Sequence, residues 1–508
     1  MEYLIMNGLQ NKVFTGRTKL VTDLLPEAET KNNYGSVPLT EENLIKDLLR
    51  ILPYHQRNSQ ECRYLLDYYR GDQPILYRQD PNRTNDVHTV VNFAHAISRN
   101  MSSFTYSGGI QYVASNPQYF EAVKTINDFM KRENKETISK EVQDYQSICG
   151  TAFLAILPDI TEKNDVPFEL RFLSPENTFV VYSSFNTNVP VYGCTHYKTC
   201  RDGKTKYIFQ VETANEFFVF EGNGFSIRKL QRVRDVVKNP MGYVPIIEYP
   251  NNAFRLGDFE VALSLLDSIN ALSSDCLYNI NSVVTSYLVL LGVDKDDINT
   301  EDASKSRIMV LPNPQGVNQD AKFIYTQLDG TATQFLRSYL ESALKLVVGM
   351  PDRDAGQTGS DTGVAAELRT GQGDQETVAK TKALYSIMAE RRLLDIAISI
   401  LAPEYIPKNI KSSDINIEIS RINRADILTK TQAMNNMYNM KFPEEDIVSF
   451  ANITNDVVGV ANRWKENQAK VTAVEKEQFE SKQNELKGKV STEEIVVEEG
   501  QRVTDQKS

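Results

Sequence analysis

Residues 258–284 form the feature that most limits how this chain can fold. Apolar side chains recur there at the spacing of one helix face, at Phe259, Ala262, Leu263, Leu266, Ile269, Leu272, Cys276, Leu277, Ile280 and Val284. This pattern predicts a long helix of nearly coiled-coil regularity, whose apolar stripe is expected to lie in the core or in a contact with another helix. The length of the stripe suggests packing against neighbouring copies of the chain.

A second helix is predicted after Asp329 or Thr331, and Gly349 and Pro351 end it. Its apolar residues are expected on one face, at Ala332, Phe335, Leu336, Tyr339, Leu340, Ala343 and Val347. Between the two helices, "SYLVLLGV", "IMVLPN" and "KFIYTQ" predict short strands.

The first half of the chain reads as an α+β region. Thr40 is predicted to cap a helix, a second helix is expected at about 59–69 with its end at Gly71, and a third at 86–104. From 106 to 250, short aromatic and β-branched runs bounded by Gly, Pro and Asn predict strands. Residues 1–40 look loosely organised.

The last part of the chain is predicted to be helical. Residues 362–401 read as one long helix with a kink at Gly371 and Gly373, since each glycine weakens a helix. A strand, "INIEISRI", then leads to two helices, and the sequence becomes charged and repetitive from Lys465.

Charge and cysteine content narrow the function classes. The 508 residues predict two or more domains, and 56 Lys plus Arg against 67 Asp plus Glu give a net charge of -11. Such a chain is not expected to bind nucleic acid strongly without sequence preference. Five irregularly spaced cysteines indicate reduced thiols and an intracellular protein. Neither a secretory signal nor a membrane-spanning segment is expected.

The stretch "GMPDRDAGQTGSDTG", Gly349 to Gly363, lies between the two predicted helices at 328–348 and 362–401. It lacks the Gly-Lys-Ser/Thr ending of a phosphate-binding loop. It also fails as a calcium loop, because Gln357 stands at the sixth position counted from Asp352. Two interpretations stay open: a plain flexible loop, or a loop exposed to a partner.

No arrangement of residues indicates catalysis. Cys194, His196 and Cys200 share one side of a predicted strand, but no fourth zinc ligand follows, so a structural role is favoured. His55, His88 and His95 are scattered, and no nucleophile or zinc-protease motif is present. We therefore expect no catalytic residue, no metal and no cofactor.

Four stretches follow one another within residues 60–465: "LLDYYRGDQPILYR", "VVNFAHAISRNMSSFTYSGGIQY", "TGSDTGVAAE" and "DILTKTQAMNNMYNMKFPEEDIVSFANITNDV". In this order they resemble the portal proteins of tailed double-stranded-DNA bacteriophages, in the branch typical of long-tailed phages of Gram-positive bacteria. The most specific match is to the family's "NN…R.GD…LiD.yN…S" pattern, at Asn251, Asn252, Arg255, Gly257, Asp258, Leu266, Asp267, Asn270 and Ser274.

The resemblance implies an α+β, mostly α, portal-type fold that assembles into a ring around a central channel. Its parts would be an N-terminal arm at 1–40, a wing at 41–257, a first stem helix at 258–286, a clip at 287–327, a second stem helix at 328–348, a tunnel loop at 349–361, a long kinked helix returning to the wing at 362–415, a crown at 416–482 and a charged tail at 483–508.

The resemblance also implies a function in the virion. The expected homo-oligomer is a dodecamer at the capsid vertex that passes double-stranded DNA and docks the terminase motor, then the head-tail adaptor, beside capsid and scaffold proteins. It would form in the host cytoplasm, without a membrane. The loop facing DNA would use Asp352, Arg353, Asp354, Gln357, Thr358 and Ser360. The channel face of the first stem helix would use Asp267, Asn270, Ser274, Asn279 and Asn281.

Two alternatives compete with a portal ring. A nucleic-acid-processing enzyme would need clustered acidic metal ligands, and the sequence shows none with useful spacing. A coiled-coil scaffold or adaptor would fit the long helices but not the β-rich region from Tyr106 to Pro250.

Overall fold

The computed structural model describes most of the body of the chain and parts of its C-terminal region. The described residues are 15–26, 35–81, 83, 86–159, 166–186, 188–201, 204–222, 229–284, 287–291, 308–311, 320–324, 330–351, 372–419, 427–444, 447–448, 460, 463–470 and 476. The chain divides into two compact units, Met1–Ile419 and Ser420–Ser508.

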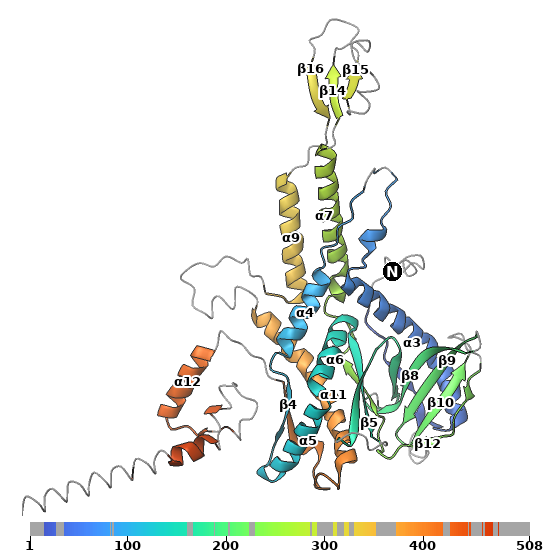
Figure 1. The fold of residues 1–508 in the computed structure, drawn as a ribbon, viewed down its shortest axis with the longest axis vertical. Helices are drawn as coiled ribbons and strands as arrows, with labels where there is room; N and C mark the ends of the chain where they lie inside the picture. Colours follow the sequence, from blue (N-terminus) through green and yellow to red (C-terminus); the bar gives the residue numbers. More distant parts are fainter. Residues whose placement is uncertain are drawn as a thin grey trace, which may run out of the picture. The chain divides into compact units, whose positions relative to one another are not determined.

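The first unit is mixed α/β and mostly helical (Figure 1). Its long helices are α3 (Glu41–Arg70), α4 (Phe93–Thr105), α5 (Phe120–Arg132), α6 (Lys135–Cys149), α7 (Leu263–Val284), α9 (Gly330–Val348) and α11 (Gln372–Leu401). Its short 3-10 turns are η1 (Pro74–Tyr77), η2 (Pro117–Tyr119), η3 (Glu260–Ala262) and η5 (Ser412–Asp414).

The helix that Thr40 begins is longer than predicted. The Thr40 side chain accepts a hydrogen bond from the Asn43 backbone, and Gly71 ends the helix with φ of 99°, so both predicted ends are confirmed. The two predicted helices between them are one, α3, with Pro53 inside it. Pro53 is exposed, so water can bond the carbonyl that the proline leaves without an N–H partner.

Two main sheets build the β-rich part of the unit. The first has the order β1 (Leu20–Thr22), β7 (Thr178–Ser183), β8 (Pro190–Arg201), β9 (Lys204–Thr213), β10 (Glu216–Gly222) and β11 (Gln231–Arg232), with β12 (Val237–Lys238) also on β10. The second has the order β13 (Ile246–Pro250), β5 (Thr151–Pro158) and β6 (Phe168–Leu173). A small parallel pair joins β2 (Leu24–Leu25) to β3 (Val37–Pro38).

The described part of the N-terminal arm is integrated into the body. Strand β1 adds to the first sheet, parallel to β7, with Leu20 opposite Val181. The guanidinium of Arg17 is buried and bonds to Glu260 at 2.5 Å and Glu61 at 3.2 Å. The expectation of a loosely organised segment is therefore wrong for residues 15–26. A buried cation needs anionic partners nearby, and the ion pairs of Arg17 together with the pairing of β1 hold this segment in place.

The predicted helix at 86–104 begins later than expected. Residues 86–92 contain no helix, and α4 starts at Phe93, where the side chain of Asn92 accepts the His95 backbone N–H. Asn92 is thus an N-cap that marks the true start. The preceding residues lie along α7, through contacts described below.

Helices α7 and α9 pack side by side (Figure 1). Their lower ends share a core in which Leu266, Ile269, Leu344 and Val348 are buried with residues of α3 and α4. In sequence, a three-stranded sheet lies between the two helices, with β14 (Tyr287–Leu291) between β15 (Ile308–Leu311) and β16 (Asp320–Ile324). The predicted strands are confirmed there.

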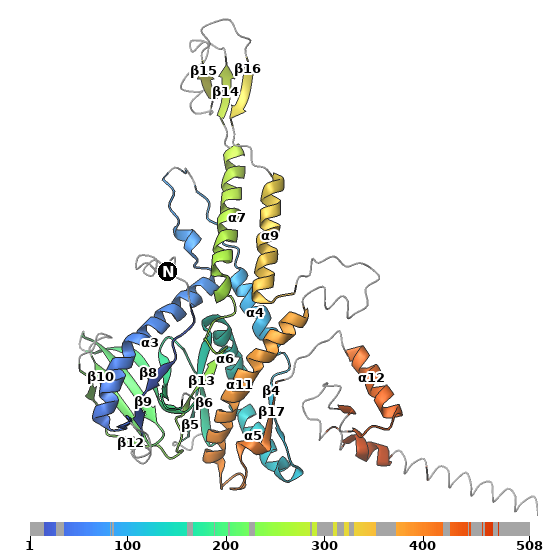
Figure 2. The same ribbon diagram turned by 180° about the vertical axis from the view of Figure 1, so that it is seen from behind.

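Helix α11 packs against α4, β13, β5 and β17 (Ile415–Ile419) (Figure 2). Strand β17 pairs antiparallel with β4 (Ile110–Ala114), so residues 415–419 belong to the first unit. The second unit starts at Ser420, four residues after the predicted start of the crown at 416, and the crown itself stays a prediction. That unit contains α12 (Ile427–Asn439) and a helical stretch at 463–470, where Trp464 stacks on Tyr438.

Candidate functional site: the stem junction

The loop predicted to face DNA lies outside the described residues. Its residues fall between the described residues Pro351 and Gln372. They are Asp352, Arg353, Asp354, Gln357, Thr358 and Ser360. The site is therefore built from the two helices before this gap, the helix after it and the segments that join them.

Two of the five polar residues predicted for the channel face of α7 are buried inside the chain. Asn270 accepts the backbone N–H of Val91 at 2.8 Å and donates to the Gln73 side chain at 2.5 Å. The hydroxyl of Ser274 accepts the backbone N–H of Thr89 at 2.9 Å. The channel-face prediction is wrong for Asn270 and Ser274, because both are fully buried within the chain, where they bond to Gln73, Thr89 and Val91.

The other three residues differ in their surroundings. Asp267 is half-buried and accepts a hydrogen bond from the Tyr68 hydroxyl at 2.8 Å; burial raises the pKa of both groups. Asn279 is half-buried and Asn281 is exposed, near the end of α7. The channel role of these three residues stays a prediction.

The segment 72–91, called the strap here, is also held to α7 by charge. Asp275 on α7 lies 2.7 Å from Arg83 and 3.0 Å from Arg78. The Arg83 guanidinium also sits 4.9 Å from the ring centre of Tyr278. Each such half-exposed contact is weak alone. Together with the buried bonds of Asn270 and Ser274, they keep the strap seated along one side of α7.

The segment from Asn251 to Asp258, which matches the family pattern, is a tightly packed turn between β13 and α7. The Asn251 amide donates to the Asp258 carboxylate at 2.8 Å and to the Leu256 carbonyl at 2.9 Å. Gly257 is required by space, since a Cβ there would lie 2.3 Å from the Ile148 carbonyl oxygen. The pattern therefore marks a structural joint at the base of α7.

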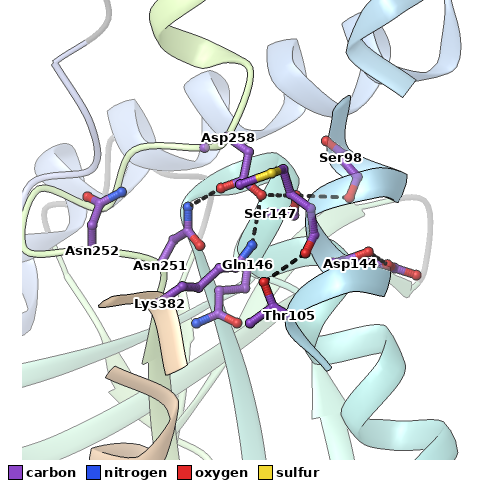
Figure 3. Close-up of polar contacts among 12 residues, drawn as sticks. Ser98, Thr105, Asp144, Gln146, Ser147, Asn251, Asn252, Asp258 and Lys382 are labelled. Carbon is purple, nitrogen blue, oxygen red and sulfur yellow. Dashed lines mark hydrogen bonds and ion pairs between the residues drawn. The ribbon is translucent and has the colours of Figure 1, made fainter. Parts of the chain in front are cut away.

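Asp258 connects three elements at this joint (Figure 3). Its carboxylate lies 2.7 Å from Lys382 Nζ on α11 and accepts the hydroxyl hydrogen of Ser147 on α6. The side chains of Asp258 and Lys382 are only 7% and 2% exposed, so this is a buried ion pair. Its partners tie the start of α7 to the helix that follows the predicted tunnel loop.

A second buried ion pair supports the same turn. Arg255 donates to both oxygens of Glu248, at 2.6 Å and 2.9 Å, and adopts a left-handed backbone conformation with φ of 58°. Burial opposes ionisation of Glu248, but Arg255 and hydrogen bonds from Tyr182 and Thr151 outweigh it and keep the pKa of Glu248 below its usual value.

Helix α11 turns a polar face into the protein interior. Gln375, Lys382, Ser386 and Glu390 are at most 4% exposed and follow the spacing of one helix face. Besides the ion pair of Lys382, Gln375 donates to Asn100 at 2.5 Å and Ser386 bonds to Tyr106 at 2.5 Å. Glu390 is bonded by Lys135, Tyr112 and Tyr249 at 2.6–2.9 Å. Because each group needs its own partner, these bonds fix the register of α11.

Helix α9 is apolar on two opposite sides. Leu344 and Val348 are buried toward α7, while Phe335, Tyr339 and Leu346 are 74%, 61% and 78% exposed. Spacings of four and seven residues place these three on one stripe, opposite Leu344. The expectation of a single apolar face is wrong, and the exposed stripe has no cover within the described residues of the chain.

A family model described as "Phage portal protein, SPP1 Gp6-like" matches residues 48–474. The chain belongs to this family. Portal proteins of this family are structural, so this chain is a non-enzymatic component of the virion, as the sequence predicted. The match includes the strap, the joint at Asp258, both stem-like helices and α11, so each of these elements is part of the portal fold.

No curated protein is significantly similar to this portal protein. Among solved structures, the neck of a native GTA particle computed with C12 symmetry is 10% identical over 71% of this chain and 89% of that chain, with a TM-score of 0.41. The likeness is too distant to add to the family match.

The cysteine and histidine residues singled out in the sequence do not gather around a metal. Cys194 and His196 are buried on β8, whereas Cys200 is exposed. Nε2 of His196 lies 2.9 Å from Nε2 of His55, which shows a histidine–histidine hydrogen bond. In the described part of the chain, no three potential ligands come together as a metal site would require. In that same part, no helix has the length and apolar character needed to cross a membrane.

Sequence reasoning missed the polar face of α11 and the buried role of Arg17. A signal for the first was present: Lys382, Ser386 and Glu390 recur every four residues on the side of the helix that also carries Ala379 and Ala383. Polar groups at the spacing of a buried face predict hydrogen-bonded partners inside the protein. For Arg17, no local pattern indicated burial.

Proposed function

We propose that this portal protein assembles into a closed ring around a channel that passes double-stranded DNA into and out of the capsid. The ring would occupy one capsid vertex, dock the terminase motor during packaging and then hold the head-tail adaptor. Twelve subunits, contacts with capsid and scaffold proteins, and assembly in the host cytoplasm follow from the family resemblance.

The exposed stripe of α9 is the observation that carries the ring proposal. Phe335, Tyr339 and Leu346 present large apolar side chains to solvent along one line of the helix. Contiguous exposed apolar surface on a folded chain marks an interaction site. In a ring with head-to-tail contacts, each copy offers two different surfaces to its neighbours, and α9 of one copy would pack on the stem of the next.

The parts of the ring are proposed from their order in the chain. Residues 41–257 would form the wing, α7 and α9 the stem, residues 287–327 the clip that meets the motor, and the second unit the crown. Residues 349–361 would form the tunnel loop near DNA, with Arg353 between two aspartates. The net charge of -11 per chain would repel DNA phosphates from most of the wall, which suits passage rather than tight binding.

Electron microscopy of the purified chain tests the proposal. Rings with a central hole are expected, and a chain with Phe335→Ser and Leu346→Ser should shift toward monomers while its circular dichroism stays unchanged. Ser338→Ala, on the same exposed helix, is the matched control. A parent chain that stays monomeric at micromolar concentration in every salt condition would contradict the ring.

Deleting Gln357 to Asp361 tests the tunnel loop separately. Ring assembly should be unaffected, and packaging or retention of DNA should fall. If the deletion prevents ring assembly instead, the loop has a structural role.

A further inference from the structure

A cavity of about 350 Å³ opens on the first unit between the two main sheets and α11. Its floor is apolar and buried, with Ile246, Ile247 and Ile396 each 2% exposed. At its rim, Val189 and Tyr243 are 47% and 45% exposed. The size and lining match those of pockets that bind small molecules or the side chains of a partner.

The rim of the cavity is held in place before any partner arrives. The buried Asn239 side chain donates to the carbonyls of Thr213 at 2.8 Å and Tyr243 at 2.7 Å. It also accepts the backbone N–H of Met241 at 2.9 Å, and Gly242 has φ of 74° in this turn. A rim fixed in this way costs little further ordering on binding, which favours recognition.

Two charged residues of α11 line the cavity, and they differ in their bonding. Arg392 donates to the Asn188 carbonyl and to the Tyr182 hydroxyl, and its guanidinium lies 5.6 Å from the ring centre of Tyr182. Asp395, one helix turn further on, is half-buried and bonds to none of the described residues. The charged group that remains available to a ligand is therefore the Asp395 carboxylate, which can accept hydrogen bonds and lies beside apolar walls.

We propose that this cavity is a docking site for a segment of a partner protein that presents an apolar side chain next to a lysine or arginine. The apolar side chain would enter between Val189 and Tyr243 and cover Ile246 and Ile396. The cation would pair with Asp395 at the edge. Apolar burial supplies affinity and the charge pair supplies selectivity. This site lies apart from α7 and α9 and does not depend on the proposed ring.

Fluorescence polarisation with two labelled pentapeptides tests the proposal. The probes are fluorescein-Gly-Leu-Phe-Lys-Gly-amide, labelled at its N-terminus, and the same peptide with glutamate in place of lysine, each titrated with the full chain. The lysine peptide should bind saturably and at least about fivefold more tightly, the effect of a half-exposed ion pair of about 1 kcal/mol. Asp395→Lys should reverse the preference, and Asp395→Asn should abolish it.

Asp374→Lys is the matched control, because Asp374 is an exposed aspartate on the same helix, outside the cavity. It makes the same change of charge and should leave the preference for lysine intact. Circular dichroism and thermal melting of each variant separate a loss of binding from a loss of fold. Equal binding of both peptides, a preference of the parent for glutamate, or no saturable binding at millimolar peptide would each overturn the proposal.

Discussion

Replacing Lys382 by methionine should destabilise the first unit, because the Asp258 carboxylate would stay buried without its cation. The two charged atoms are 2.7 Å apart, and the side chains are 2% and 7% exposed, so solvent screens the pair little. Removing one partner of such a pair costs about 3–5 kcal/mol. Asp258 would keep its hydrogen bonds from Asn251 and Ser147, which places the expected loss near the lower end, about 3 kcal/mol.

A double variant separates the ion pair from general damage to packing. Asp258→Asn together with Lys382→Met removes both charges, so the combined loss should be smaller than the sum of the single losses by about 2 kcal/mol. Urea unfolding followed by far-ultraviolet circular dichroism measures these losses. Trp464, the only tryptophan, lies in the second unit, so its fluorescence serves as an internal control. Additive losses, or a single-variant loss below about 1 kcal/mol, would refute the reasoning.

Three further substitutions have defined outcomes. Burial lowers the pKa of His196 to about 4, so protonation destabilises the fold and the free energy of unfolding falls as pH drops from about 6.5 to 4. His196→Gln should reduce this loss of stability in acid unfolding curves, and a variant with the same acid slope as the parent would contradict the prediction. Burial raises the pKa of Glu212 to about 7, so its neutral carboxyl is favoured in the fold and the free energy of unfolding falls as pH rises from about 4.5 to 7. Glu212→Gln should therefore raise the free energy of unfolding at pH 8 by up to about 3 kcal/mol in urea melts. If the variant is no more stable than the parent, burial of the charge does not destabilise the fold. Arg17→Met leaves Glu61 and Glu260 buried without their shared cation and should cost about 3–5 kcal/mol, with faster amide hydrogen exchange at 17–22; unchanged exchange there would show that the arm is held by other contacts.

Local signals in the sequence predicted much of the fold. The Thr40 cap, the Gly71 end and the three short strands between α7 and α9 all depend on residues within a few positions of each other. The wrong predictions concern segments whose structure depends on residues far away in the sequence. Nothing near 86–92 shows that this segment lies along α7, and propensity alone does not distinguish an extended strap from a helix.

The candidate site shows why polar residues on a predicted helix are ambiguous. Asn270 and Asn281 both interrupt the apolar pattern of α7, yet one is fully buried and the other exposed. A side chain that faces water and one that bonds a neighbouring backbone segment leave the same mark in the sequence, because both need hydrogen-bond partners. Only the position of the strap distinguishes the buried asparagine from the exposed one. That position depends on hydrogen bonds between residues that are almost two hundred positions apart in the sequence.

The same ambiguity changes how the family pattern is understood. Asn251 bonds to Asp258, Gly257 packs against α6, and Asp258 contacts Ser147 on α6 and Lys382 on α11, so these pattern residues serve the interior of the chain. The buried ion pair between Asp258, just before α7, and Lys382 on α11 leaves little freedom for either helix to move alone. A displacement of α11 at Lys382 would have to either break the Asp258–Lys382 pair or carry the residues just before α7 with it. The pair therefore couples α11 to the start of α7, which a surface contact screened by water would not do.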